Sequence, residues 1–288
     1  MATEPRPREG GRILIDALAL NGADTVFCVP GESYLAALDA LHDTQQIRTI
    51  VCRQEGGAAM MAEAYGKLTG RPGICFVTRG PGASNASSGL HVAAQDSTPM
   101  ILFIGQVDST TVDREGFQEV DYKQMFGFTA KFVGEIVDAA RIPEYVNRAY
   151  QIATSGRPGP VVLALPEDML VDVATVADAA PSKAAQAEPS ANQLAQLQAM
   201  LDKAERPIVV VGGGVWSQKA AEAIGRFATA SDLPIFTTFR RQDYVANDLP
   251  TYAGFLGVGM PASAIKRAKD SDLILAVGTR LGDVVTDG

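Results

Sequence analysis

Cysteine and histidine are scarce in this chain of 288 residues, which has three cysteines and two histidines. No CxxC pair and no histidine cluster occurs, which argues against a metal site. The three cysteines, Cys28, Cys52 and Cys75, all lie in apolar runs typical of strands. Buried free thiols in a reducing compartment explain them better than disulfides do, and the sequence predicts a cytoplasmic protein.

Long apolar runs and strongly basic stretches are also missing. No segment reaches the roughly 18 consecutive apolar residues of a membrane-spanning helix, and residues 1–11 lack the apolar core of a secretory signal. The chain has 25 Lys and Arg against 33 Asp and Glu, a net charge of −8. No basic stripe is interleaved with aromatics, so we expect neither a nucleic-acid partner nor a membrane partner.

Apolar segments are abundant, since 47% of the residues are hydrophobic, which allows a large core and about two domains. In residues 1–170, continuous apolar runs alternate with segments of helical periodicity. This alternation is typical of an α/β fold in which helices cover both faces of a parallel sheet. We therefore predict a three-layer domain over residues 1–170. Its expected strands are Thr25–Val29, Arg48–Cys52, Gly73–Thr78, Met100–Gly105 and Val161–Leu165.

The composition changes over residues 171–191. Ala, Pro, Ser and acidic residues follow one another there without periodicity, which predicts a surface linker. A second α/β unit over residues 192–288 has three expected strands, Ile208–Val211, Ile235–Thr238 and Leu273–Val277. Three strands without a closing helix make a poor independent domain, so we interpret this unit as an incomplete, truncated Rossmann-like middle domain.

A candidate small-molecule site centres on Glu55, which follows the second expected strand and begins a helix. Taken alone, a carboxylate there complements the helix dipole, an effect of about 0.3–1 kcal/mol. Gly56 and Gly57 follow it directly, although each costs a helix roughly 1 kcal/mol relative to alanine. A second bare turn, Gly80–Gly82, follows the next strand. Because ligands bind at the carboxyl ends of strands in open α/β sheets, these features predict a ligand site.

The same segments resemble a known family, the thiamine-diphosphate-dependent enzymes, and within it the acetolactate synthase-like branch. The likeness covers almost the whole chain, with the motifs in the order and at the spacing of the family. The matching segments are Asp24–Gly31, Glu55–Ala58, Ala62–Gly66, Gly80–Asn85, Phe117–Glu119 and Ser155–Val161. The resemblance implies decarboxylation and carboligation of a 2-keto acid, with pyruvate as the expected donor.

The resemblance also assigns roles to individual residues. Glu55 corresponds to the catalytic acid that hydrogen-bonds the aminopyrimidine ring of thiamine diphosphate and moves its proton. Gln118 corresponds to a glutamine that reaches toward cofactor and substrate, and it lies in a polar loop of the kind that carries function. The positions implied to contact the cofactor are Pro30, Gly31, Glu55, Pro81, Gly82 and Asn85.

In the second unit, the glycine run Gly212–Gly214 follows an expected strand and invites comparison with a dinucleotide-binding turn. The pattern is incomplete, because Ser217 occupies the position of the third glycine. The next expected strand ends at Thr238 without the acid that binds the ribose hydroxyls of NAD. The signal for a nicotinamide cofactor is therefore weak.

Arg240 and Arg241 could meet a 2′-phosphate, which keeps NADP open, although surface charge is the preferred interpretation. The resemblance implies another role for this unit, because acetolactate synthases bind FAD structurally in their middle domain. The implied flavin contacts are Gly213, Gly214 and Arg280. Many relatives keep the domain without flavin, so FAD is a possible cofactor.

The family holds the diphosphate and its Mg²⁺ in a third domain, through Gly-Asp-Gly and a later Asn-Asn, contributed by a partner subunit. Neither motif occurs here, since Gly282-Asp283 is followed by Val284 and no Asn-Asn exists. We therefore expect no metal ligands among these residues, with the Mg²⁺ ligands in a missing C-terminal domain. We also expect a homodimer or homotetramer, because the site needs a partner.

Two residues beside the expected pocket depart from the family pattern. Gln54 stands where acetolactate synthases usually carry histidine before the acid, and Arg79 stands where a small residue precedes Gly-Pro-Gly. Lys131 matches a lysine near the substrate channel of the family. These departures leave open another thiamine-diphosphate-dependent 2-keto acid decarboxylase or acyl transferase. A non-catalytic nucleotide-binding module is the alternative from a different class.

Overall fold

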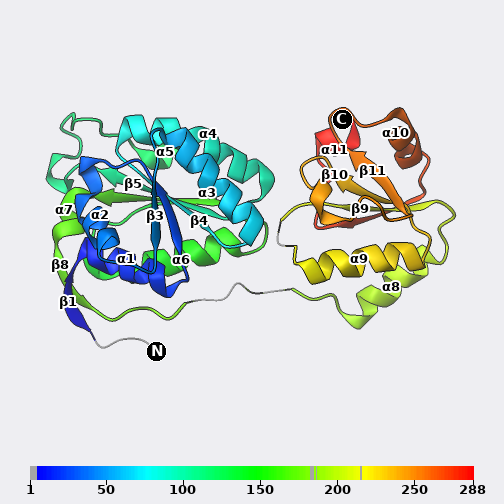
Figure 1. Cartoon of the computed structure of the whole chain (residues 1–288), viewed down its shortest axis with the longest axis horizontal. Helices are drawn as coiled ribbons and strands as arrows, with labels where there is room; N and C mark the ends of the chain where they lie inside the picture. The colour runs from blue at the N-terminus through cyan, green and yellow to red at the C-terminus, as the bar shows by residue number, and fades with distance from the viewer. Residues whose placement is uncertain (1–4, 182–184, 186, 215) are drawn as a thin grey trace. The chain divides into compact units, whose positions relative to one another are not determined.

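The computed structural model describes residues 5–181, 185, 187–214 and 216–288. It divides the chain into two compact units, Met1–Ala185 and Gln186–Gly288, each built around a parallel sheet (Figure 1). The first unit runs from blue to green in Figure 1 and the second from yellow-green to red.

Six parallel strands form the centre of the first unit, in the order β3-β2-β4-β5-β7-β6. They are β2 (Thr25–Cys28), β3 (Arg48–Val51), β4 (Gly73–Val77), β5 (Met100–Gln106), β6 (Phe132–Glu135) and β7 (Pro160–Pro166). Five of them are the strands that the sequence predicts. The sequence does not predict the edge strand β6, because its four residues include a glycine and an acid.

Helices cover both faces of this sheet, which confirms the predicted three-layer fold. Side chains alternate along each strand, so Val26 and Cys28 pack in one core while Phe27, between them, packs in the other. The helices of the first face are α1 (Gly10–Leu20), α2 (Leu35–His42) and α6 (Ile142–Thr154). Those of the second face are α3 (Glu55–Thr69), α4 (Gly80–Asp96) and α5 (Tyr122–Phe126). Shorter helical turns are η1 (Glu32–Tyr34), η2 (Ser109–Thr111), η3 (Ala139–Arg141) and α7 (Glu167–Val171).

The small residues of α3 and α4 allow these two helices to pack closely. A Cβ atom added at Gly89 in α4 would lie 2.5 Å from the Cβ of Ala59 in α3, far inside van der Waals contact. Only a glycine fits there, because protein interiors are packed too closely to leave room for another methyl group. The close packing brings the first turns of both helices side by side, and these turns carry the candidate site.

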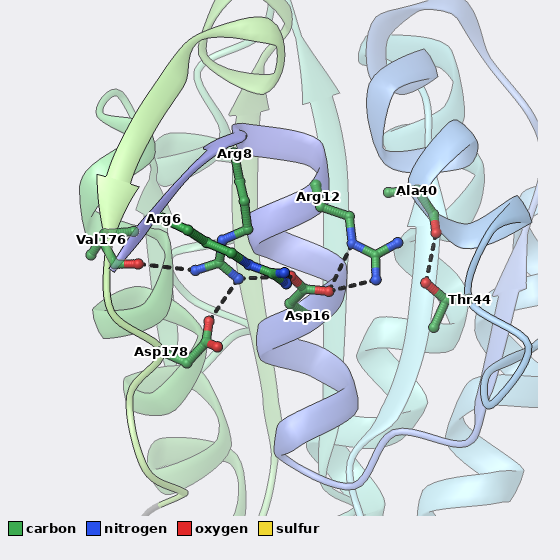
Figure 2. Close-up of polar contacts among 8 residues, drawn as sticks. All are labelled: Arg6, Arg8, Arg12, Asp16, Ala40, Thr44, Val176 and Asp178. Atoms are coloured by element: carbon green, nitrogen blue, oxygen red, sulfur yellow. Dashed lines mark hydrogen bonds and ion pairs between the residues drawn. The ribbon is translucent and has the colours of Figure 1, made fainter. Parts of the chain in front are cut away.

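A two-stranded antiparallel ribbon joins the start of the first unit to its end. Strand β1 (Arg6–Glu9) pairs with β8 (Val173–Val176). Figure 2 shows Arg8, whose guanidinium lies 2.7 Å from the Asp16 carboxylate and 2.8 Å from that of Asp178. All three side chains are largely buried, so each charge depends on its partners. Strand β8 lies within the segment that the sequence predicts as a linker, so the predicted start of the linker at residue 171 is too early. The sequence misses β8 because a strand of four residues gives too little alternation to recognise.

The second unit has four parallel strands in the order β11-β10-β9-β12, the arrangement of one half of a doubly wound nucleotide-binding sheet. The prediction of three strands without a closing helix is wrong, because β11 and α10 follow the first two. Gly254 interrupts the apolar run of β11 and hides it from sequence patterns. The strands are β9 (Pro207–Val211), β10 (Ile235–Thr238), β11 (Tyr252–Leu256) and β12 (Leu273–Val277). The helices are α8 (Ala191–Leu201), α9 (Gln218–Ala230), α10 (Ala262–Lys269), α11 (Asp283–Thr286) and the short η4 (Gln242–Tyr244).

All three cysteines are free thiols. Burial raises the pKa of Cys28 to about 11, and it raises the pKa of the fully buried Cys75 well above its ordinary value. Within the described part of the chain, no helix combines the length and the apolarity that crossing a bilayer requires.

Candidate active site

The order of the strands singles out one edge of the first sheet. The chain runs outward from β2 to β3 and then returns to the other side of β2 to form β4, so the strand order reverses between β2 and β4. In open α/β sheets, ligands bind at the carboxyl ends of the strands at such a reversal. Pro30 and Gly31 follow β2 there, Glu55 follows β3, and the Gly80–Gly82 turn follows β4.

Glu55 is the first residue of α3 and is half-buried. The side-chain amide of Asn85 in α4 donates a hydrogen bond of 2.9 Å to its Oε2 atom. Its Oε1 atom lies 3.6 Å from the point that a Cβ of Gly82 would occupy. The structure thus brings together Glu55, Gly82 and Asn85, and a side chain at Gly82 would fill space beside the carboxylate.

The two glycines after Glu55 have different surroundings. A Cβ atom at Gly56 would lie 2.9 Å from the side-chain oxygen of Gln54 and 3.0 Å from the carbonyl oxygen of Asn85. Close packing within the chain therefore explains Gly56. Gly57 is exposed, and a Cβ there would meet only Gln54 Oε1, at 3.9 Å. Gln54 itself caps α3, because its Oε1 atom accepts a hydrogen bond of 2.8 Å from the Gly57 amide.

The corner after β2 packs onto the end of β4. A Cβ at Gly31 would lie 2.6 Å from the Cβ of Thr78, so the corner can approach β4 only with glycine at this position. A hydrogen bond of 2.9 Å between the hydroxyls of Ser33 and Thr78 holds the same contact. Pro30 and Pro81 are both exposed and line the surface of this edge.

Gln118 reaches this edge through its main chain. Its carbonyl oxygen accepts a hydrogen bond of 3.1 Å from the amide of Gly80, the first residue of α4. The residue has a positive φ of 65°, a conformation that is uncommon outside glycine and often marks functional loops. The loop before it is anchored where the Ser109 amide donates to Asp168, at 3.1 Å. The main chain of Gln118 therefore lies beside the Gly-Pro-Gly turn, a placement that the sequence does not predict.

Arg79, which precedes that turn, is buried and forms two ion pairs. Its guanidinium lies 3.3 Å from Glu32, after β2, and 2.6 Å from Glu167, after β7. The sequence pattern does not reveal this cluster, although each of the three residues follows an apolar strand within four positions. This recurrence of charged residues just after apolar strands is the one sign of the cluster in the sequence.

Lys131 lies at the opposite edge of the sheet, because it precedes β6. Its ammonium group donates to the carbonyl of Ser155 at 2.8 Å and also to that of Ile152, both at the end of α6. Burial, together with the nearby charge of Arg157, lowers its pKa. Within this chain, the structure does not bring Lys131 to Glu55.

The glycine run of the second unit meets a second glycine segment at the reversal between β9 and β12. Gly213 has a φ of 81°, and a Cβ there would lie 1.8 Å from the Gly278 carbonyl oxygen. The Gly213 carbonyl accepts hydrogen bonds from Arg241 Nε at 2.6 Å and from the Tyr244 hydroxyl at 2.8 Å. The interpretation of Arg241 as surface charge is wrong, since the residue is buried. Arg280 lies two residues beyond Gly278 and is exposed.

Among the residues that the structure describes, no group of three or more His, Cys, Asp or Glu side chains could hold a metal ion.

Comparison with known families agrees with this geometry. Residues 8–125 match the N-terminal TPP-binding domain of thiamine pyrophosphate enzymes, and residues 194–288 match the central domain of the same enzymes. Thiamine pyrophosphate, or TPP, is thiamine diphosphate.

The relatives described next are all named acetolactate synthases. The chain is 34% identical over 277 residues to the acetolactate synthase isozyme 2 large subunit of Escherichia coli, covering 96% of this chain and 50% of the relative. It is 35% identical to the chloroplastic acetolactate synthase 3 of Brassica napus, covering 97% and 44%. A probable acetolactate synthase large subunit of Methanocaldococcus jannaschii is 32% identical, covering 96% and 48%. The chain thus spans about half the length of these relatives. With both domain models and the curated relatives in agreement over nearly all of its residues, the chain belongs to the thiamine pyrophosphate enzyme family.

Proposed function

We propose that this chain serves the thiamine-diphosphate-dependent decarboxylation and carboligation of a 2-keto acid, with pyruvate as the donor. The contact between Glu55 and Asn85, at the reversal of strand order, carries the proposal. It places a carboxylate with one oriented oxygen at the ligand-binding edge of a domain whose relatives are named acetolactate synthases.

The residues at this edge fit the pyrimidine half of the cofactor. Asn85 donates to Glu55 Oε2, which orients the carboxylate and leaves Oε1 beside the bare backbone of Gly82. A planar ring can approach Oε1 there because no Cβ occupies that space. Pro30 and Pro81 offer exposed apolar surfaces at the same edge of the sheet. We call this set of residues, Pro30, Glu55, Pro81, Gly82 and Asn85, the cradle. It suits a flat heterocycle that accepts or donates one hydrogen bond.

When bound, thiamine diphosphate supplies a nucleophilic carbon and an electron sink for decarboxylation. Glu55 holds and moves a proton at a ring nitrogen, as a general acid and base within hydrogen-bond reach. Asn85 keeps the Glu55 carboxylate in one orientation. Gln118, whose main chain is tied to Gly80, is the residue that we place next to the substrate.

Further partners belong to the same proposal. We place the Mg²⁺ that accompanies the diphosphate on ligands outside the residues described here. FAD is the proposed occupant of the second unit, at the corner where Gly213 meets Gly278, with Gly214 and Arg280 beside it. The visible absorbance spectrum of the purified protein tests the flavin, because oxidised flavin absorbs visible light and the domain without flavin would show no such band.

Dimerisation, or a tetramer built from dimers, is supported by apolar side chains that the described residues leave uncovered. Met60 and Met61 are each 39% exposed on α3, and Leu68 is 84% exposed farther along that helix. Phe128 is fully exposed, beside residues of α4. Exposed apolar groups of this size commonly mark an interface. We place the assembled protein in the cytoplasm, where its three free thiols remain reduced.

The test is the substitution Glu55→Gln in the full protein. It keeps the size of the side chain and the contact with Asn85 but removes the proton-carrying group, so we expect turnover of pyruvate to fall by at least about a hundredfold. The matched control is Glu63→Gln, the same change eight residues later in α3, where Glu63 accepts a hydrogen bond of 2.9 Å from Thr98. Equal activity in the Glu55→Gln protein and the parent would refute the role of Glu55.

A second candidate is another thiamine-diphosphate-dependent decarboxylase or acyl transferase. The two ion pairs of the buried Arg79 and the capping role of Gln54 favour it, because Gln54 directly precedes Glu55 and Arg79 directly precedes the Gly80–Gly82 turn. Product analysis separates the two: a carboligase forms a new carbon–carbon bond, whereas a decarboxylase releases an aldehyde. A non-catalytic nucleotide-binding module would instead bind ADP or NADP tightly in calorimetry and leave both 2-keto acids and thiamine diphosphate untouched.

A further inference from the structure

Arg79 occupies an unusual position for a charged residue. It is 7% exposed and lies immediately before α4, a helix of 17 residues. A cation at the start of a helix opposes the helix dipole, and a buried charge without partners is strongly unfavourable. The side chain makes no capping hydrogen bond to α4. Local helix formation therefore does not explain an arginine at this position.

The explanation lies in two carboxylates from distant segments. Arg79 Nη1 lies 3.3 Å from Glu32 Oε1, and Arg79 Nη2 lies 2.6 Å from Glu167 Oε2. The planar guanidinium can hold two carboxylates at once in fixed directions, which a lysine cannot do. Its third nitrogen, Nε, is buried without a hydrogen-bond partner among the described residues. The guanidinium is thus committed to these two contacts and offers little to solvent.

These contacts join three strand ends around the cradle. Glu32 begins η1 and is separated from Pro30 only by Gly31. Arg79 directly precedes the Gly80–Gly82 turn after β4. Glu167 begins α7 after β7, which lies two strands away from β4 across β5. One side chain therefore ties the corner after β2 to the turn after β4 and secures both to the far half of the sheet.

We propose that Arg79 is a positioning residue for the cofactor cradle. The ion pair with Glu32 fixes the separation between two segments that we call the walls, the Pro30–Gly31 corner and the Gly80–Gly82 turn, whose Gly82 lies beside the Glu55 carboxylate. The ion pair with Glu167 secures Arg79 to the end of β7. Arg79 acts through these walls, and no contact joins it to Glu55. The role in cofactor binding rests on the proposed function, whereas the role in fixing the two walls rests on the ion pairs alone.

The substitution Arg79→Met keeps much of the side-chain length and removes both ion pairs. We expect the dissociation constant for thiamine diphosphate, measured by calorimetry with Mg²⁺, to rise roughly tenfold. Arg79→Lys keeps the charge but can reach only one carboxylate well, so its dissociation constant should fall between those of Arg79→Met and the parent. This partial rescue by the conservative variant distinguishes positioning from a merely space-filling role.

Hydrogen exchange provides a measurement that needs no cofactor. In Arg79→Met, we expect faster amide exchange in residues 30–35 and 79–86, with exchange in α1 and α6 unchanged. The matched control is Arg71→Met, which removes an exposed ion pair of 2.7 Å with Asp24 at the other end of β4. The control should change neither the exchange of those segments nor the dissociation constant.

The outcomes separate this inference from the proposed function. Faster exchange around both walls in Arg79→Met alone supports positioning, even if the parent binds no thiamine diphosphate, in which case the proposed function fails. Exchange and affinity equal to those of Arg71→Met would overturn the inference. Faster exchange throughout the first unit would also overturn it, because Arg79 would then stabilise the fold as a whole rather than the two walls.

Discussion

Gly82→Ala separates folding from cofactor binding at the cradle. The added Cβ would lie 3.1 Å from Thr78 Cγ2, 3.4 Å from Val77 Cβ and 3.6 Å from Glu55 Oε1. The first contact is tight but involves a methyl group that can shift by a few tenths of an ångström. Alanine in place of a helical glycine gains up to roughly 1 kcal/mol, which offsets that contact. We therefore expect a change in unfolding free energy below about 1 kcal/mol, or a shift of the unfolding midpoint under roughly 4 °C.

The same methyl group occupies the space beside Glu55 Oε1 that a ring would need. We expect the dissociation constant for thiamine diphosphate to rise at least about tenfold, equivalent to 1.4 kcal/mol or more. Calorimetric titration with Mg²⁺ measures it, and thermal unfolding measures the stability. Gly57→Ala is the matched control for folding, because its Cβ meets nothing closer than 3.9 Å and should leave the unfolding free energy within about 1 kcal/mol of the parent. Parental affinity in Gly82→Ala would refute the placement of the ring beside Gly82.

Three further predictions follow from contacts and burial. Asn85→Ala removes the donor to Glu55 Oε2 and should lower turnover by about tenfold or more while thermal unfolding stays within about 1 kcal/mol, since a net hydrogen bond contributes about that much; unchanged turnover would contradict the orienting role. Arg8→Met breaks the buried ion pair with Asp178, whereas Asp16 keeps its contact with Arg12 at 2.8 Å, and should destabilise the first unit by up to about 3–5 kcal/mol in urea unfolding. The raised pKa of Cys28 predicts stability that is complete below about pH 9, the ordinary thiol pKa, and declines as pH rises toward about 11, because only the unfolded thiol ionises freely there. A stability curve that is flat between those pH values would oppose this reasoning.

Hydrophobic patterning predicts the core of the first unit well, for a physical reason. The central strands are buried on both faces, so they appear as continuous apolar runs such as Met100–Gly105, and their helices show clear periodicity. Strands at the edges are different, because they need burial on one face at most. β8 and β11 are short, and a polar residue or a glycine interrupts them. Their pairing partners, rather than their own residues, make them strands.

The candidate site also contains some residues that the sequence reveals and others that it does not. Glu55 and the Gly80–Gly82 turn can be recognised locally, because an acid or a bare backbone at the end of a strand has few structural explanations. The resemblance to a family adds Asn85 and Gln118. The ion pairs of Arg79 cannot be predicted without the strand order, since Glu167 follows Arg79 by 88 residues in the sequence. The contact of Arg241 cannot be predicted either, because only the turn after β10 brings its side chain within hydrogen-bond distance of the Gly213 carbonyl.

The ribbon of β1 and β8 has a consequence for how the protein is made. Arg8 leaves the ribosome 168 residues before Val176, whose carbonyl it contacts. The first unit therefore cannot complete its structure while it is being translated until β8 has emerged, and during that interval the N-terminal segment has no strand to pair with. Tags or deletions before Gly10 would act on this late closing step and on the yield of folded protein.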